Sequence, residues 1–230
     1  MAAYDGPNIE FEVDRPGLKV AAVVLRDLQV TASTTSFEEY ESEVFKKIQS
    51  GMTLEDAKDD PIFRSYRDLY WTFGMDPTKL RVSSEAVLRR ILKGQNLWRI
   101  SNIVDAVNLA SAYHKIPIGL VDLAKLDGNL TIRTAANGEM FQRIGGKIIM
   151  CRGREIVVAD EEKIVCFGYA THDSERTMVT KDCREVLVLL YGSSAVTAPS
   201  LKQALTVTVD MIDQWVECTL SESAIFNSQS

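Results

Sequence analysis

The polar side chains best suited to chemistry are concentrated in one loop, residues 171–180, THDSERTMVT, between two strand-like runs. Its His172 is one of only two histidines in the chain, and imidazole is the side chain that exchanges protons near neutral pH. A guanidinium beside hydroxyl groups could receive a carboxylate or a phosphate. The candidate catalytic residues are therefore His172 and Asp173, and the candidate substrate-binding residues are Arg176, Thr177 and Thr180. The same composition is typical of a solvated hairpin loop, and that alternative stays open.

A second polar set lies on a predicted helix. From residue 98 onwards, apolar residues recur at three- and four-residue spacing, which predicts a helix that packs one face on a core. Asn102, Asp105 and Asn108 fall on another side and form a second candidate substrate-binding set. Amides and carboxylates near a helix start also bond the neighbouring backbone, so a structural role for this stripe is equally open.

The ends of this helix follow from residue types. Ser101 is expected to cap its first turn. Pro117 cannot continue a helix and disfavours helical backbone just before it, so the helix should end near His114 or Lys115. His114 is then a satisfied residue at a helix end, which leaves His172 as the better candidate for proton transfer.

Charge is distributed unevenly along the chain. The net charge is −6, yet residues 79–99 hold six basic residues against Glu85 alone, a local charge of +5. Such a segment on an acidic body suits a partner with a few phosphates better than a long duplex, so DNA is not expected. The candidate phosphate-contacting residues are Lys79, Arg81, Arg89, Arg90, Lys93 and Arg99. The alternative is that these side chains form the solvated side of a helix.

The remaining composition is that of an ordinary globular protein, with 46% hydrophobic and 25% charged residues among 230. No window approaches the roughly 18 apolar residues of a membrane span, and the N-terminus lacks the features of a signal peptide, so a cytoplasmic location without membrane contact is expected. The four cysteines have no paired-ligand spacing, and strong catalytic motifs are absent. We therefore expect reduced, mostly buried thiols, and neither a metal nor a cofactor.

Hydrophobic periodicity predicts mostly helices in the first part of the chain and strands afterwards. IEFEV and LKVAAVVL should be strands, the second buried on both faces because it is almost continuously apolar. Helices are expected over about 37–49, 54–59, 61–74 and 85–94, with caps at Ser36 and at Ser83 or Ser84. From Ile118 onwards short β-type runs alternate with turns, until a helix over about 199–216, after which SESAIFNSQS should fray.

These elements predict an α+β fold in which helices pack on a mainly β C-terminal half. We expect a single domain over residues 1–230. Its parts are N-terminal strands and helices to about residue 80, a core over about 81–192, and a closing helix over about 199–217.

Residues 99–141, RISNIVDAVNLASAYHKIPIGLVDLAKLDGNLTIRTAANGEMF, resemble the B3/B4 module of the phenylalanyl-tRNA synthetase beta subunit. The likeness runs from about Arg81 to Gly192. The stretch YRDLYWTFGMDPTKLRVSSEAVLRR, together with DSERTMVT, resembles more closely the free-standing proteins built on that module. The length, which leaves nothing for an aminoacylation domain, agrees with a free-standing form.

The resemblance implies a B3/B4-like fold and a site between the predicted helix and the sheet, with Asn102, Asp105 and Asn108 on the matching helix. In the synthetase this module houses the editing site, which hydrolyses tyrosine wrongly attached to phenylalanine tRNA. The chain departs from that pattern in two places: Gly119 stands where the synthetase has a histidine, and the region of Val188 and Leu189 is apolar where it has a glutamate. Recognition of a phenol by hydrogen bonding therefore has no obvious partner here.

Two functions from different classes follow. In the first, the protein is a stand-alone aminoacyl-tRNA deacylase that binds the acceptor end through residues 79–99 and orients water at the ester. Asp173, Arg176 and Thr177 would then hold the amino acid. In the second, it is a non-catalytic module that binds tRNA, a free amino acid or a similar small molecule. The retained polar loop favours the first function, and the acidic net charge and the missing histidine and glutamate favour the second.

Overall fold

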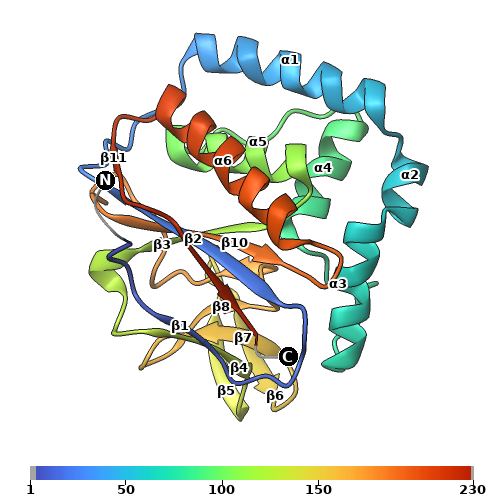
Figure 1. Ribbon diagram of the computed structural model, residues 1–230, viewed down its shortest axis with the longest axis vertical. Coiled ribbons are helices and arrows are strands. Elements are labelled where there is room, and N and C mark those ends of the chain that lie inside the picture. Colours follow the sequence, from blue (N-terminus) through green and yellow to red (C-terminus); the bar gives the residue numbers. More distant parts are fainter. Residues whose placement is uncertain (1–3, 229–230) are drawn as a thin grey trace.

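The chain is arranged in layers over residues 4–228, the part that the computed structural model describes. Figure 1 shows one sheet in the middle, helices on one side of it and a second sheet on the other. The predicted α+β fold, with helices packed on a mainly β C-terminal half, is confirmed.

The central sheet has the order β11-β2-β10-β3, and β12 also pairs with β2. Its strands are β2 (Lys19–Arg26), β3 (Ile118–Asp122), β10 (Val186–Gly192), β11 (Thr219–Leu220) and β12 (Ala224–Asn227). Every residue of β3 and β10 is buried, as are the six inner residues of β2. A strand covered on both faces must be apolar throughout, and this accounts for the continuous apolar runs in the sequence. The predicted two-sided burial of LKVAAVVL is confirmed.

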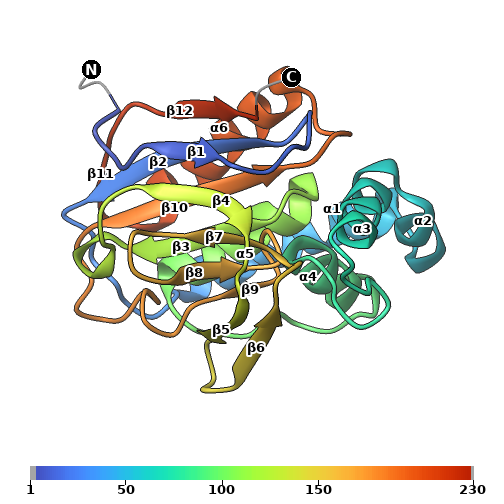
Figure 2. The ribbon, with the colours of Figure 1, turned by 90° about the horizontal axis from the view of Figure 1, so that it is seen from below.

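The second sheet has the order β1-β4-β7-β8-β9, with β1 and β4 parallel and the other pairs antiparallel. Its strands are β1 (Ile9–Phe11), β4 (Leu130–Thr134), β7 (Ile156–Ala159), β8 (Ile164–Phe167) and β9 (His172–Asp173). A two-stranded ribbon of β5 (Asn137–Gln142) and β6 (Ile148–Arg152) projects from the body, as Figure 2 shows. The turn of the ribbon is tied back to β9, because the Ile144 amide donates to the Asp173 carbonyl at 3.1 Å.

Helices α5 and α6 cover the central sheet, and α1 to α4 pack around them (Figure 1). The helices are α1 (Thr35–Gly51), α2 (Leu54–Asp59), α3 (Pro61–Thr72), α4 (Ser83–Leu92), α5 (Asn102–His114) and α6 (Ala198–Trp215), and a 3-10 turn covers Leu123–Lys125. The predicted end of α5 is confirmed: His114 is its last residue, and Lys115 takes the left-handed conformation.

Three predicted caps differ in detail. Ser101 stands at the N-cap position of α5, but its side chain makes no capping hydrogen bond. Helix α1 is capped by Thr34, whose hydroxyl accepts from the Phe37 amide, and not by Ser36. Helix α4 has no side-chain cap, because Ser83 and Ser84 already lie inside its first turn. The Ser83 amide instead donates to the Ala170 carbonyl at 3.0 Å, so a loop from the second sheet meets this helix start.

The C-terminal segment does not fray over its described residues. Residues 224–227 form β12, which pairs with Lys19–Ala22 along the open side of β2, and the Phe226 ring packs edge-on against Tyr4 with centroids 5.7 Å apart. An unpaired edge of a central strand presents free amides and carbonyls, and this segment satisfies them. The prediction of fraying was therefore wrong for these residues.

Candidate functional site

A cavity of about 180 Å³ lies between the middle of α5 and the strand β3, under the loop that follows β9. Most of its lining is apolar: Ile100, Val104, Val107, Ile118, Leu120, Ile144, Met178 and Val179. Two polar residues complete it, Asn108 from α5 and Asp173 from β9. An apolar cavity with two convergent polar groups is the usual form of a small-molecule site. We call it the α5–β9 pocket.

Asp173 is the ionisable group of the α5–β9 pocket. Burial raises the pKa of its carboxyl from 3.8 to about 6, and the Cys166 thiol and the Leu120 backbone amide offset only part of this effect. Among residues 4–228 no ion pair involves Asp173. A carboxylate held without a cation and with a pKa near neutrality is suited to accept and return a proton.

Gly119 on β3 explains how Asp173 fits. A Cβ at this position would lie 3.1 Å from the Tyr191 hydroxyl and 3.3 Å from a carboxylate oxygen of Asp173. The space of a side chain at position 119, where the resembled pattern has a histidine, is thus filled by a phenol and a carboxyl group. Tyr191 is fully buried, and its hydroxyl has no hydrogen-bond partner among the described residues.

The other departure from the synthetase pattern is also structural. Val188 and Leu189 are fully buried in β10 and pair with Leu120 and Gly119. They stand in the strand beside β3, and they present no polar group to the α5–β9 pocket.

The predicted stripe on α5 divides into two environments. Asn102 and Asp105 are 6% and 1% exposed and belong to a polar network at the helix start. The Asn102 side chain accepts from the Thr31 amide at 3.0 Å and donates to the Gln29 carbonyl at 2.9 Å. These bonds tie α5 to the chain between β2 and α1, while Asn108 is the one member of the stripe that lines the pocket.

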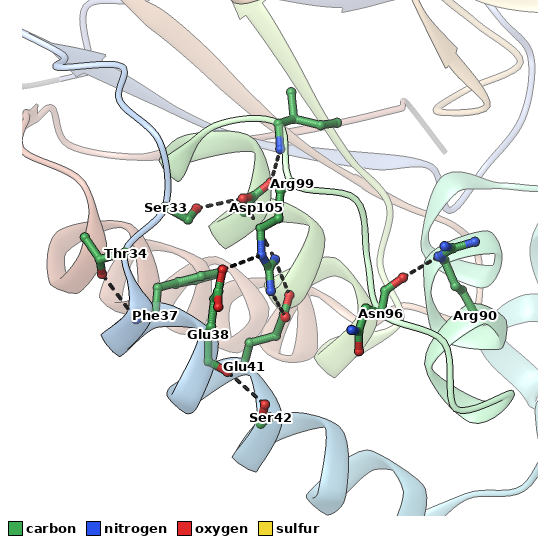
Figure 3. A network of polar contacts seen from close by, with 11 residues as sticks. Ser33, Thr34, Phe37, Glu38, Glu41, Ser42, Arg90, Asn96, Arg99 and Asp105 are labelled. Carbon is green, nitrogen blue, oxygen red and sulfur yellow. Dashed lines mark hydrogen bonds and ion pairs between the residues drawn. The ribbon is translucent and has the colours of Figure 1, made fainter.

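Figure 3 shows the rest of this network around Asp105. Its carboxylate accepts from the Ser33 hydroxyl at 2.6 Å and from the Ile100 amide at 3.0 Å. Arg99 lies between α1 and α5, bonded to both oxygens of Glu41 and 3.9 Å from Asp105. Each charge is matched within the fold, so the network stabilises the start of α5.

The loop 171–180 is ordered and partly strand, so it is not a solvated hairpin loop. His172 pairs with Phe167 in the β8–β9 ladder, and burial, together with the charges of Arg143 and Lys147, lowers its imidazole pKa. Thr177 is 1% exposed and Thr180 is half-buried; neither lines the α5–β9 pocket.

Arg176 is directed away from this pocket. Its guanidinium donates to the Lys125 carbonyl at 2.6 Å and forms an ion pair with Asp160 at 2.5 Å. It lines a different cavity, of about 560 Å³, beneath the β5–β6 ribbon. The structure therefore brings Asn108 and Asp173 together and separates both from Arg176.

The basic segment is only partly free. The buried carboxylate of Glu85 faces Arg81 at 3.4 Å, Arg89 at 3.9 Å and also Arg67 at 2.8 Å. Lys79 lies 3.6 Å from Asp76, and Arg99 is held by Glu41. Within residues 4–228 the two predicted phosphate contacts without a carboxylate partner are Arg90 and Lys93, at the C-terminal end of α4.

Arg90 is held by a different kind of contact. Its guanidinium lies 4.4 Å from the centroid of the Trp98 ring. The same guanidinium donates to the Asn96 carbonyl, and Figure 3 shows this bond. Trp98 is 53% exposed.

No group of three or more His, Cys, Asp or Glu side chains that could hold a metal ion occurs over residues 4–228. All four cysteines are free thiols, and three of them are buried, as predicted. The helices over the same residues include none that is long and apolar enough to cross a membrane.

The sequence patterns did not predict the apolar walls of the α5–β9 pocket. Ile144 is the clearest case: it is a large apolar residue 50% exposed beside the Gly145–Gly146 turn of the ribbon. An apolar side chain at a hairpin turn is unusual, and it indicates a surface that contacts something else. Met178 and Val179 carried a similar signal, since they interrupt an otherwise polar loop.

A model of the B3/4 domain family matches residues 65–208, which is more than half of the chain. The phenylalanine–tRNA ligase beta subunit of Fusobacterium nucleatum subsp. nucleatum is 29% identical over 101 residues, 44% of this chain and 12% of that subunit. The corresponding subunit of Chromobacterium violaceum is 35% identical over 83 residues, 36% of this chain and 11% of that subunit. The chain thus matches only a small part of these relatives.

A solved structure gives the same picture of the fold. An N-terminal fragment of the phenylalanyl-tRNA synthetase beta subunit from Pyrococcus horikoshii aligns with a TM-score of 0.52 at 12% identity. The alignment covers 100% of this chain and 57% of the fragment.

Proposed function

The chain belongs to the B3/4 domain family, and from this premise we propose that it is a tRNA-related protein that binds an aminoacyl ester in the α5–β9 pocket and hydrolyses it. The observation that carries the proposal is Asp173: a carboxyl group with a pKa of about 6 and no ion-pair partner within residues 4–228, on the wall of a largely apolar cavity. The apolar walls would take the amino-acid side chain, and Asn108 offers an amide to the polar end of the ligand.

The reaction needs little from the protein beyond position and one base, because the ester is already labile. The Asp173 carboxylate takes a proton from water, and the hydroxide attacks the ester carbonyl carbon. The bond between that carbon and the ribose oxygen then breaks, and Asp173 returns the proton to the ribose oxygen. Above its pKa of about 6 the carboxyl group is mostly ionised and able to start this cycle.

The partner at the other end of the ester would be the acceptor end of a tRNA. The C-terminal end of α4 supports this, because Arg90 and Lys93 carry charges that no carboxylate neutralises within residues 4–228. Helix α4 packs on α5, which forms one wall of the pocket, so these charges belong to an element next to the site.

The test is release of labelled amino acids from a panel of correctly and wrongly charged tRNAs, measured against a buffer control. We expect release from one or a few pairs, and an Asp173→Asn variant slower by about 10² to 10⁴-fold, the usual contribution of a general base. Asp160→Asn would serve as the control, because Asp160 pairs with Arg176 away from the pocket.

Two outcomes contradict this mechanism. An Asp173→Asn variant as fast as the parent would remove Asp173 as the base. No release from any pair by folded protein would leave the second function, a non-catalytic module for tRNA or a free amino acid.

A further inference from the structure

Trp98 is a large aromatic side chain that the fold leaves 53% exposed on a short segment between α4 and α5. The segment itself is firmly held. On one side of Trp98, Leu97 is 5% exposed; on the other, Arg99 is bonded to Glu41, and the Ile100 amide donates to Asp105 at 3.0 Å. The exposure of the ring is therefore built into the fold and does not come from a loose loop.

One face of the ring is already covered. The Arg90 guanidinium lies 4.4 Å from the ring centroid, and its bond to the Asn96 carbonyl fixes it there. Because that contact covers one face, the exposed half of the side chain includes the opposite face. A flat aromatic face of this kind, backed by a cation, is what a nucleobase stacks on.

The platform stands next to the mouth of the α5–β9 pocket. Ile100 lines that pocket and is itself 63% exposed, so it lies at the entrance. Two residues of chain span at most about 7 Å, which places Trp98 within that distance of Ile100 along the backbone. In an aminoacylated nucleotide, one ribose ring separates the ester from the base, so a ligand with its amino acid in the pocket carries its base at a comparable distance.

We infer that Trp98, backed by Arg90, is the stacking site for the nucleobase whose ribose carries the aminoacyl ester. The inference rests on the proposed function, and it assigns a binding site to the nucleobase, which the α5–β9 pocket itself does not contact. Arg90 has a second role in this arrangement. Its guanidinium has no carboxylate partner within residues 4–228, so it can pair with the phosphate on the 5′ side of the base. The α5–β9 pocket then binds the aminoacyl group, and the Arg90–Trp98 pair binds the nucleotide.

The experiment uses stable amide analogues of 3′-aminoacyl-adenosine and the matching amino-acid methylamides, which lack the nucleoside. Binding to the full chain is measured by calorimetry for the parent, Trp98→Ala, Trp98→Tyr and Trp71→Ala. Trp71 on α3 is the matched control, since it is 58% exposed and lines none of the cavities described above. Circular dichroism confirms that each variant is folded.

We expect Trp98→Ala to weaken the aminoacyl-adenosine analogue about five- to a hundredfold, the range measured for loss of one stacked base. Trp98→Tyr should restore most of the affinity, and Trp71→Ala should leave it unchanged. None of the three variants should change binding of the methylamide. A charged tRNA tested in parallel shows whether the same base is read at the end of a tRNA or only in a free aminoacyl nucleotide.

Different outcomes contradict the stacking site and the proposed function. If the parent binds the adenosine analogue and Trp98→Ala binds it equally well, the stacking site is refuted while the proposed function stands. If the parent binds the methylamide as tightly as the adenosine analogue, the base adds no affinity, and the stacking site is refuted in the same way. If the parent binds neither ligand, the aminoacyl site fails and the stacking site falls with it.

Discussion

The first turn of α5 and its middle carry similar polar residues in opposite circumstances. At the start of the helix, Asp105 is 1% exposed and accepts from Ser33 and Ile100, with Arg99 beside it (Figure 3). In the middle, Asn108 opens into the α5–β9 pocket, opposite an Asp173 that no cation neutralises within residues 4–228. The Asp105 carboxylate has a cation beside it, whereas the Asp173 carboxylate is stabilised only by the Cys166 thiol and the Leu120 amide.

The difference teaches which polar groups are structural. Buried polar groups whose hydrogen bonds are all made hold segments together, and removing such a group lowers the free energy of unfolding. Buried charged groups without a countercharge destabilise the folded protein. Such groups are common at sites where they bind a ligand or exchange a proton. The comparison predicts that variants at the first turn lower the stability of the fold, and that variants at the pocket change its chemistry.

The largest expected effect is at the first turn. Asp105→Ala leaves the Ser33 hydroxyl and the Ile100 amide without their acceptor, and it removes one of the carboxylates beside the Arg99 guanidinium. We expect a loss of about 3 to 5 kcal/mol in the free energy of unfolding, typical of removing one partner from a buried charged network. Urea denaturation followed by circular dichroism measures it.

Asn108→Ala is the matched control on the same helix, and it should cost no more than about 1 kcal/mol, because Asn108 is only partly buried. Equal losses from the two variants would remove the distinction between the first turn and the middle of α5.

A smaller effect, with the opposite sign, is expected at the pocket. The pKa of Asp173 is about 6 in the folded protein against 3.8 for an ordinary aspartate, so above pH 6 the fold carries a charge that it disfavours. Asp173→Asn should therefore raise the free energy of unfolding at pH 8, by about 2 to 3 kcal/mol at most.

The pH dependence checks the sign. As pH falls from about 7 to about 4, the folded parent takes up a proton before the unfolded chain does, so the parent gains stability relative to the variant. The advantage of Asp173→Asn should thus fade over that window. Urea midpoints at a series of pH values measure this, and an advantage independent of pH would show that the carboxyl is not desolvated in the fold.

The same contrast marks how far the sequence could be read. Patterns within one segment were enough to predict the ends of α5, the two-sided burial of β2 and the α+β class. These patterns are the spacing of hydrophobic residues, the position of proline and continuous apolar runs. The division between Asn102 and Asn108 does not, because the partners of Asn102 are Gln29 and Thr31, some 70 residues earlier in the chain. Only the packed fold shows which side of the helix meets that segment.

Two other outcomes have the same cause. Arg176 looked like a ligand of the substrate, but Asp160 and the Lys125 carbonyl occupy its guanidinium, and nothing local in the sequence indicates this. β12 is ordered because β2 offers it an unpaired edge, although its polar surroundings in the sequence resemble a frayed end. Long-range partners decided both cases, and local patterns could not supply them.

The smallest expected effect separates two neighbouring arginines of α4. Arg89 pairs with the buried Glu85 at 3.9 Å, while Arg90 stacks on Trp98 and has no carboxylate partner within residues 4–228. Arg89→Glu would place a second negative charge beside Glu85 and destabilise the fold, so a double Arg89→Glu, Arg90→Glu variant confuses folding with binding.

Arg90→Gln alone is the sharper test. It should weaken tRNA binding by a few-fold, and it should lower the slope of log K against log salt by about 1, the signature of one lost phosphate contact. Arg64→Gln is the control, because Arg64 lies exposed on α3, 3.9 Å from Asp59. Filter binding across a range of salt concentrations gives both slopes. If the two variants share the parent's slope, Arg90 contacts no phosphate, and its role is confined to holding the ring of Trp98.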